Sequence, residues 1–397
     1  MHSTLFPPLP PETRRLLNTI PALVEKTFPI PGRFRRELPA NIKKLSRLLT
    51  GDRGQRSLSY LGHPNLLGAY LHYFLPWNLY RLCRLLPALD ISLYNGDTVV
   101  DLGCGPLTFA AALWISRPEL RSQKLEFLCV DHCGPALEAG KDFFAALTGG
   151  RSPWKLHTIR DSTENFSLKN KPVALVCAIN LFNEIDSKLP QGDVAAQNRR
   201  AKNAARLLNG FTSDTGSILV VEPGIPNSGQ FITLLRTALM GCGRPVVSPC
   251  PHELSCPMPG GFSLTGNERV KKRWCHFAFD TEDAAAALHR LSAAAGIPKE
   301  RAVLSFLFTA RAAAEKDSAP LPSPVERRGF LPVRVISDAF SLPHNRCGRY
   351  GCSARGLVLL TGERSSIEKT ASGMLLEAEL GEPAQRDPKS GALMVNA

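Results

Sequence analysis

The most constraining feature of this sequence is a regular alternation of apolar runs and amphipathic segments between residues 98 and 240. The first two runs, Thr98–Leu102 and Leu125–Asp131, are almost continuously apolar. Strands of this kind are buried on both faces, so they predict a parallel sheet covered by helices. The expected strands span 98–102, 125–131, 173–179 and 217–222, and the expected helices span 108–115, 135–147, 193–208 and 229–240.

A glycine loop follows the first expected strand. The strand ends in Asp101, and Gly103 and Gly105 follow it before the next helix. Ligands of doubly wound sheets bind at the carboxyl ends of the strands, where glycines allow a tight turn. The second strand ends in Asp131, which can accept hydrogen bonds from both hydroxyls of a ribose. Asp101, Gly103, Gly105 and Asp131 are therefore the expected cofactor-binding residues.

The residues after this loop separate two classes of cofactor. A dinucleotide site expects a third glycine, but the sequence continues Pro106-Leu107-Thr108. The Asp-Leu-Gly-x-Gly form resembles class I methyltransferases, which implies an α/β, Rossmann-like core over residues 96–245 and S-adenosylmethionine as cofactor. Many of those enzymes carry a small residue where Leu107 stands. The alternative is a Rossmann-like shell with an empty pocket.

The sequence assigns no catalytic residue. The third expected strand lacks the Asn/Asp-Pro-Pro-Tyr/Phe signature of amino-group methyltransferases. Cys177 lies inside that strand, whereas a nucleophile for cytosine C5 methylation must stand at its end. Whether the chain is an enzyme stays open; if it is, it is an S-adenosylmethionine-dependent methyltransferase. The candidates for lining the pocket are Asn180, Asn183, Glu184 and Glu222.

Five cysteines near prolines or glycines form a second pattern. Eleven scattered cysteines do not resemble a secreted disulfide framework, so a reducing interior and metal ligation are expected. Four converging thiolates are the usual ligands of an iron–sulfur cluster or a structural zinc, and unrelated buried cysteines are the alternative. The five are Cys250, Cys256, Cys275, Cys347 and Cys352.

Several blocks together resemble the methyltransferase-like family of small-ribosomal-subunit assembly factors of mitochondria and bacteria. The resemblance spans roughly residues 55–360. It implies association with the small ribosomal subunit and a [4Fe–4S] cluster held by Cys250, Cys256, Cys275 and a fourth cysteine. Cys352 fits the fourth position better than Cys347, and zinc is the alternative metal. The blocks are Val100-Asp-Leu-Gly-x-Gly-Pro106, Asn183-Glu-Ile185, Val221-Glu-Pro-Gly224, Cys250-Pro-His-x3-Cys-Pro257 and Trp274-Cys-His-Phe277.

Charge is concentrated at the N-terminal end. The net charge is +13, and residues 1–60 hold eleven Lys/Arg against four acidic residues. Such a field suits a polyanion, so ribosomal RNA is the expected partner, with a solvated basic face as the alternative. The family's basic stretch near the C-terminus is reduced here to Lys369 and isolated charges.

Five segments are expected along the chain. A basic helical region (1–95) precedes the methyltransferase core (96–245) and a cysteine-rich, metal-binding insert (246–280). The remaining core helix and strands, with a small C-terminal β region, follow (281–363), and a polar tail closes the chain (364–397). No apolar run is long enough to span a membrane. The first residues lack a secretory signal, and early prolines disfavour a mitochondrial presequence, so a bacterial cytoplasm is favoured over the mitochondrial matrix.

The function expected from these patterns is a small-subunit assembly or translation factor. It would bind ribosomal RNA and carry S-adenosylmethionine and an iron–sulfur cluster. An active S-adenosylmethionine-dependent rRNA methyltransferase is the first alternative. A protein or small-molecule methyltransferase with a zinc clip is the second. The sequence does not fix the oligomeric state.

Overall fold

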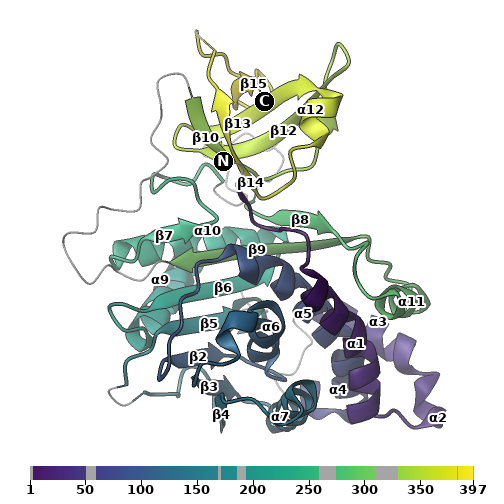
Figure 1. Ribbon diagram of the computed structural model, residues 1–397. Coiled ribbons are helices and arrows are strands. Elements are labelled where there is room, and N and C mark those ends of the chain that lie inside the picture. Colours follow the sequence, from purple (N-terminus) through teal and green to yellow (C-terminus); the bar gives the residue numbers. More distant parts are fainter. Residues whose placement is uncertain are drawn as a thin grey trace.

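The computed structural model describes residues 3–50, 60–168, 171–185, 194–258, 274–309, 330–381 and 383–396. These residues form a large α/β unit, with a small β unit above it in Figure 1. The expected α/β sheet is confirmed, and it is a mixed sheet. None of the helices in the described ranges is long and apolar enough to cross a membrane.

The α/β unit is built on an eight-stranded sheet whose order is β4-β3-β2-β5-β6-β9-β7, with β8 paired to β9. The first five strands in this order are parallel to one another, whereas β9 runs antiparallel to its neighbours β6, β7 and β8. The strands are β2 (Thr98–Leu102), β3 (Glu126–Asp131), β4 (Lys155–Arg160), β5 (Leu175–Ile179), β6 (Ser217–Pro223), β7 (Val246–Ser248), β8 (Phe277–Asp280) and β9 (Arg301–Thr309).

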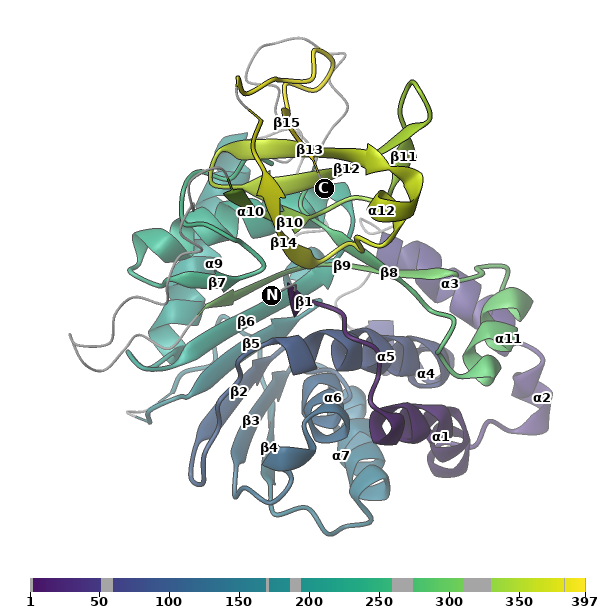
Figure 2. The same ribbon diagram turned by 45° about the horizontal axis from the view of Figure 1, so that its top comes forward.

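Helices cover both faces of this sheet because successive strand residues point to opposite sides. Val99 is buried in the core that includes α6, α7 and the N-terminal helices, and Val100 is buried in the core under α9 and α10. Figure 2 shows the two helix layers with the sheet between them. The helices are α6 (Thr108–Ser116), η5 (Pro118–Leu120), α7 (Gly134–Thr148), α8 (Phe182–Ile185), α9 (Val194–Phe211), α10 (Pro226–Gly241) and α11 (Ala286–Ala294).

The N-terminal region is helical and packs against the sheet unit. A break at Pro76 is expected from its sequence, but the structure continues the helix through a π-turn into α5. Pro76 lies in the first turn of α5, where a residue without an N–H group costs little. The elements are α1 (Pro11–Thr27), α2 (Gly32–Arg35), α3 (Leu38–Thr50), η2 (Tyr60–Gly62), α4 (Pro64–Ala69), the π-turn η3 (Tyr70–Phe74), α5 (Leu75–Leu85) and η4 (Leu86–Ala88).

The second sheet forms the small β unit. Its path is β1-β14-β10-β12-β13-β15, β14 also pairs with β15, and β11 pairs with β12. The pairing of β14 with β15 closes the strands into a barrel. Its elements are β1 (Ser3–Thr4), β10 (Phe330–Val335), β11 (Phe340–Ser341), β12 (Arg346–Ser353), β13 (Gly356–Glu363), α12 (Arg364–Glu368), β14 (Met374–Glu379) and β15 (Leu393–Asn396).

Two expected boundaries differ from the structure. The expected polar tail from residue 364 is wrong, because α12, β14 and β15 belong to the barrel and bury Ile367, Leu376 and Val395. In β14 the exposed Glu377 and Glu379 alternate with buried residues, so the composition of this segment looks polar. The core also does not end at residue 245, since β7 and β8 of the expected insert both pair with β9 of the main sheet.

Candidate cofactor site and cysteine group

A cavity of about 400 Å³ opens at the carboxyl ends of β2, β3, β4 and β5. This volume falls in the range of small-molecule sites. Residues of the N-terminal region also border it. The wall consists of Tyr60, Leu61, Tyr70, Gly103, Gly105, Asp131, His132, Cys133, Asp161, Ser162, Thr163, Glu164, Ile179, Asn180, Leu181, Glu184 and Ile185.

The glycine loop has the tight turn expected from its sequence. Gly103 and Gly105 have φ angles of +66° and +52°, which L side chains rarely adopt. A Cβ atom on Gly103 would lie 2.6 Å from Cδ1 of Leu181. The backbone N–H groups of Gly103 and Cys104 donate to the carbonyl of Val130 on β3, at 2.8 and 3.2 Å. The loop is therefore fixed against the second strand.

Leu107 stands in the position where a third small residue is common, and it is buried with a left-handed φ of +54°. The close approach of loop and helix is made possible by Gly140 of the facing helix α7. A Cβ atom on Gly140 would lie 2.6 Å from both Cγ of Leu107 and the carbonyl carbon of Pro106. The small residue that permits close packing is thus on α7 instead of in the loop.

The two acids predicted to bind the cofactor have different positions. Asp131 faces the cavity; its Oδ2 accepts from the Gly105 N–H at 2.9 Å and its Oδ1 from the Cys133 N–H at 2.8 Å. Each carboxylate oxygen has two acceptor positions, so Asp131 can still accept from ribose hydroxyls.

Asp101 lies behind the loop, fully buried, and does not border the cavity. Its Oδ1 accepts from the Cys177 thiol at 3.3 Å, and its Oδ2 has no partner among the described residues. Burial raises the pKa of Asp101 to about 7. The structure therefore brings Gly103, Gly105 and Asp131 to the cavity, with Asp101 beneath them.

Only two of the four pocket candidates at the ends of β5 and β6 border the cavity. Asn180 and Glu184 line the cavity, whereas Asn183 and Glu222 lie behind it. Glu222 is fully buried and accepts from the backbone N–H groups of Phe182 and Asn183, at 2.8 and 3.0 Å. Burial raises the pKa of Glu222 to about 7, and its hydrogen bonds hold the start of α8 beside the cavity.

Several residues of this site were not found by sequence reasoning. The Tyr60 hydroxyl donates to the Glu184 carboxylate at 3.2 Å, and Arg81 of α5 donates from Nη2 to Oδ1 of Asn180 at 3.3 Å. No motif in the sequence marks the aromatic residues of the N-terminal region as part of the wall. Asp161 follows β4, a strand that the apolar pattern does not reveal.

The cavity is acidic. Asp131, Asp161, Glu164 and Glu184 contribute carboxylates, and no Lys or Arg occurs among the described residues of the wall. The carboxylates of the wall would repel the negative charges of a bound diphosphate, so a diphosphate is disfavoured. A cationic ligand is attracted by the same carboxylates.

The predicted metal ligands come together where the α/β unit meets the barrel. Burial raises the pKa of the Cys275 thiol well above its usual range, and the neighbouring Cys256, Cys250 and Cys352 raise it further. Cys352 is on β12 of the barrel, and its Sγ lies 3.3 Å from Nε2 of His252. Cys347 is five residues earlier on the same strand, on the opposite face, and is buried in the barrel interior. Cys352 is therefore the C-terminal cysteine that joins the group.

Two buried arginines adjoin these thiols. Arg236 of α10 donates from Nε to Sγ of Cys250 at 3.1 Å and from Nη2 to the carbonyl of His252 at 2.8 Å. Arg334 of β10 donates from Nε to the carbonyl of Pro249 at 2.9 Å. Neither guanidinium pairs with a carboxylate in the described part of the chain. Buried cations require an anionic neighbour, which thiolates can supply.

The described residues do not form a mononuclear metal site. No group of three or more of their His, Cys, Asp or Glu side chains is placed to hold a single metal ion.

Comparison with known proteins identifies the family. The model of the family described as mitochondrial small ribosomal subunit Rsm22 matches residues 68–339, which is more than half of the chain. The chain belongs to the Rsm22 family. No curated protein matches it.

Solved structures resemble this Rsm22-family chain only loosely. A geranyl diphosphate methyltransferase in complex with SAM is 12% identical, with a TM-score of 0.34, over 64% of this chain and 93% of the other. The plantazolicin methyltransferase BpumL in complex with SAH is 13% identical, with a TM-score of 0.27, over 76% and 98%. A precorrin-6y C5,15-methyltransferase from Geobacter metallireducens GS-15 is 10% identical, with a TM-score of 0.31, over 55% and 82%.

The match to the Rsm22 family covers the two candidate sites unequally. The range 68–339 contains the glycine loop, Asp131 and three of the four grouped cysteines. Cys352 and most of the barrel follow it, and Tyr60 precedes it.

Proposed function

We propose that this chain is a small-ribosomal-subunit assembly or translation factor that binds S-adenosylmethionine and ribosomal RNA. The observation that carries the proposal is the acidic cavity below a methyltransferase-type glycine loop, in a chain of a family named for the small ribosomal subunit. S-adenosylmethionine carries a sulfonium and an ammonium group, so its charge complements this wall.

The residues around the cavity suggest how the cofactor would lie. The ribose hydroxyls would donate to Asp131, at the end of β3. The base would then reach the end of β4, where Asp161 and Ser162 can bind an exocyclic amine. The cationic end would lie between the glycine loop and Glu184. The Tyr60–Glu184 hydrogen bond would close the site from the N-terminal region.

Calorimetric titration tests cofactor binding. Asp131→Ala should weaken S-adenosylmethionine binding at least about tenfold, because two charge-assisted hydrogen bonds are lost. Asp142→Ala is the matched control, since Asp142 is an exposed acid on the following helix α7. Equal affinity of the Asp131 variant and the control would refute the proposed pose. Absence of binding to the unaltered protein would refute the cofactor itself.

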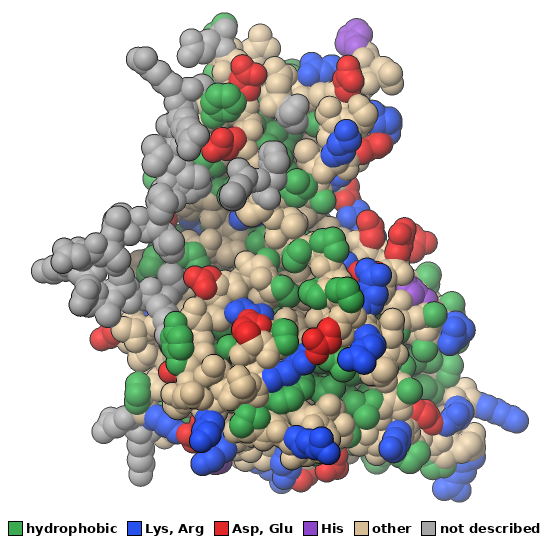
Figure 3. All heavy atoms as spheres, in the orientation of Figure 1, with side chains coloured by type: hydrophobic (Ala, Val, Ile, Leu, Met, Phe, Trp, Pro, Cys, Tyr) green, Lys and Arg blue, Asp and Glu red, His purple; other side chains and the backbone are tan. Residues whose placement is uncertain are grey.

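Ribosomal RNA would bind on the basic N-terminal helices. Residues 32–50, covering α2 and α3, carry six exposed Lys/Arg and one acidic residue. Figure 3 shows Lys and Arg side chains gathered at the lower right, where these helices lie. A field of this sign and extent binds phosphates and makes affinity strongly dependent on salt.

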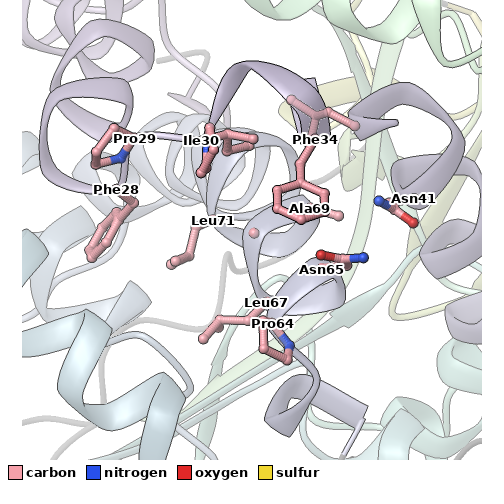
Figure 4. A pocket seen from close by; sticks show the side chains of 13 residues that line it. Phe28, Pro29, Ile30, Phe34, Asn41, Pro64, Asn65, Leu67, Ala69 and Leu71 are labelled. Carbon is pink, nitrogen blue, oxygen red and sulfur yellow. The ribbon is translucent and has the colours of Figure 1, made fainter. Parts of the chain in front are cut away.

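A groove of about 360 Å³ lies beside these charges, between the end of α1 and helices α2, α3 and α4. Figure 4 shows Phe28, Ile30, Phe34 and Leu71 around it, with the amide groups of Asn41 and Asn65 on one side. Apolar walls with a few amides suit an unstacked RNA base. Co-sedimentation with purified small subunits tests this surface. Replacing Arg33 and Arg36 by Glu should weaken binding and reduce its salt dependence, and unchanged binding would refute the assignment.

The cysteine group would hold a [4Fe–4S] cluster through Cys250, Cys256, Cys275 and Cys352. The donor set fits, because the buried Arg236 and Arg334 compensate a negative cluster. A cluster binds each cysteine at a different iron atom, so its ligands stand further apart than those of one zinc ion. The wider spacing of cluster ligands agrees with the four thiols, which raise one another's pKa but, among the described residues, are not placed to hold a single metal ion. When bound, the cluster would supply a cross-link between the α/β unit and the barrel.

Metal analysis of anaerobically purified protein decides between the two metals. Iron and acid-labile sulfide in equal amounts, near four per chain, are expected for a [4Fe–4S] cluster. Stoichiometric zinc without sulfide would replace the cluster by a zinc clip.

Methyl transfer is the second candidate function. The observation that favours it is the Tyr60–Glu184 pair in the cofactor cavity, since its carboxylate can accept a proton from a methyl acceptor. Cys177 is excluded as a nucleophile, because it is buried behind the loop and its pKa is raised well above the usual range. Incubation of small subunits with methyl-labelled cofactor tests this function. Label in RNA that is lost with Asp131→Ala supports it, and no label in RNA or protein refutes it.

A further inference from the structure

The barrel has the topology of a known class of nucleic-acid-binding domain. Its first three strands, β10, β12 and β13, form an antiparallel meander, and α12 connects the third strand to the fourth. The fifth strand, β15, runs parallel to β13 and antiparallel to β14, and β14 pairs with β10. This closed order, with its single parallel pair, is that of the five-stranded OB-fold barrel.

The inside of this barrel is filled. Val333, Val358, Leu360 and Val395 are buried within it, and Ile367 of α12 is completely buried beside them. A ligand can therefore contact only the outer surface. In OB-folds the ligand lies across the second and third strands and the loops beside them, which correspond here to β12 and β13.

The outer face of β12 and β13 has two different ends. Cys352 and Leu357 pair at one end and are buried in the core cluster shared with the α/β unit. At the other end, Tyr350 of β12 and Phe340 of β11 are half-buried, with ring centroids 5.1 Å apart. Gly348 leaves space for this layer, since a Cβ there would lie 2.9 Å from Leu342 and 3.3 Å from Phe340. Both rings are partly buried and pack against the same core cluster.

Exposed basic residues lie at both ends of the β12–β13 face, with Arg346 at the aromatic end. Arg346 begins β12 and Arg355 follows the same strand, while Arg386 and Lys389 lie in the loop between β14 and β15; all four are exposed. Two acids on this side are engaged within the protein: Asp338 pairs with Arg301, and Asp387 accepts from the Ser390 N–H at 2.8 Å. The exposed Glu363 lies opposite Arg346 in the β12–β13 register, and the exposed Glu379 of β14 pairs with Asn396 of β15.

We infer that the β12–β13 face of the barrel binds a single-stranded segment of RNA. Unpaired bases would stack on the aromatic layer of Phe340 and Tyr350, and the phosphates would lie along Arg346 and Arg386. This inference deepens the proposed RNA-binding function, on which it rests, by adding a second site with a preference for single strands. Stacking platforms with basic rims bind single strands without strong sequence preference.

Fluorescence anisotropy of the full chain with a labelled 12-nucleotide uridine RNA tests this site. Phe340→Leu together with Tyr350→Leu removes the rings and keeps an apolar layer, so the fold should persist; the melting temperature checks it. The affinity for the oligouridine should fall about tenfold, and that for a 12-base-pair RNA duplex should not change. Arg346→Gln should weaken single-strand binding, whereas Lys369→Gln, an equal charge change beyond α12, should not.

Each outcome decides something. Full single-strand affinity in a folded double-leucine variant overturns the inference. A variant that keeps its oligouridine affinity but loses small subunits makes this face a protein contact, which also overturns it. Sedimentation of wild-type protein with small subunits tests the proposed function separately, because the oligouridine measurement does not depend on subunits.

Discussion

The cavity below the glycine loop and the cysteine group are charged for opposite ligands. The cavity is lined by carboxylates and contains no Lys or Arg among its described residues, so it suits a cation. The cysteine group has two buried arginines without carboxylate partners among the described residues, so it suits an anion. The cavity lies at the strand ends of one sheet, whereas the cysteine group connects two units. Substitutions in the cavity should therefore change mainly ligand binding, and substitutions in the cysteine group should change mainly stability.

Loss of a grouped cysteine should have the largest effect. Cys275→Ser should abolish metal binding and lower the melting temperature by about 10 °C or more, because the proposed cluster would cross-link the two units and metal binding contributes directly to folding. Calorimetry and iron analysis of anaerobic protein measure both changes. Cys242→Ser is the control, since Cys242 is exposed and outside the group. A melting temperature and iron content equal to those of the control would break the comparison.

Gly140→Ala should come next. The added Cβ would lie 2.6 Å from the backbone of Pro106, so either α7 or the loop must move. We expect a loss of about 2 kcal/mol in the free energy of unfolding, together with weaker cofactor binding. Gly210→Ala is the matched control, because its Cβ would meet nothing within 4 Å. Urea unfolding of both variants gives the difference, and equal stabilities would show that Gly140 does not permit the close packing.

The pH dependence of stability should identify the buried acid under the loop. The pKa of Asp101 is raised to about 7 in the folded chain, so between its unfolded value and pH 7 the folded state holds a proton that the unfolded state has lost. Stability from this group is therefore full below about pH 4 and falls as the pH rises to 7, by roughly 2–4 kcal/mol.

Asp101→Asn removes this titration. Denaturant unfolding at several pH values should show a shallower decline for the variant than for the wild type. Parallel curves would mean that Asp101 is ionised in the fold.

The smallest effect should come from loss of the hydrogen bond between Tyr60 and Glu184 at the cavity wall. Tyr60→Phe removes the hydrogen bond to Glu184 and keeps the ring, so cofactor affinity should fall about threefold. Titration calorimetry measures the change, with Tyr94→Phe as the control, because Tyr94 is exposed and remote from the cavity wall. A loss beyond about a hundredfold would instead indicate that the hydroxyl contacts the cofactor directly.

Much of the α/β sheet could be predicted because its strands are apolar without interruption. β4 was missed, since it is an edge strand in which Lys155 and His157 alternate with less polar residues and Arg160 ends the strand. β14 was missed for the same reason: Glu377 and Glu379 alternate with buried residues. Periodicity over such short strands, half of whose residues face solvent, resembles that of a loop.

The candidate sites were predictable where their residues follow a strand directly. Gly103, Gly105 and Asp131 are of this kind, because the carboxyl end of a parallel strand faces the ligand side. Tyr60 and Arg81 depend on how separate helices pack on the sheet, and nothing local in the sequence specifies that packing. The grouped cysteines could be picked out from the sequence, but Arg236 and Arg334 could be recognised only once α10 and β10 were placed.

The cavity should accept a cationic nucleoside and reject a diphosphate. Titration of one preparation with S-adenosylmethionine and with NAD tests it most directly. We predict saturable binding of S-adenosylmethionine with a dissociation constant below about 100 μM, and no binding of NAD up to about 1 mM. Binding of NAD in that range, or no heat of binding from S-adenosylmethionine, would show that the cavity does not select a cationic nucleoside over a diphosphate.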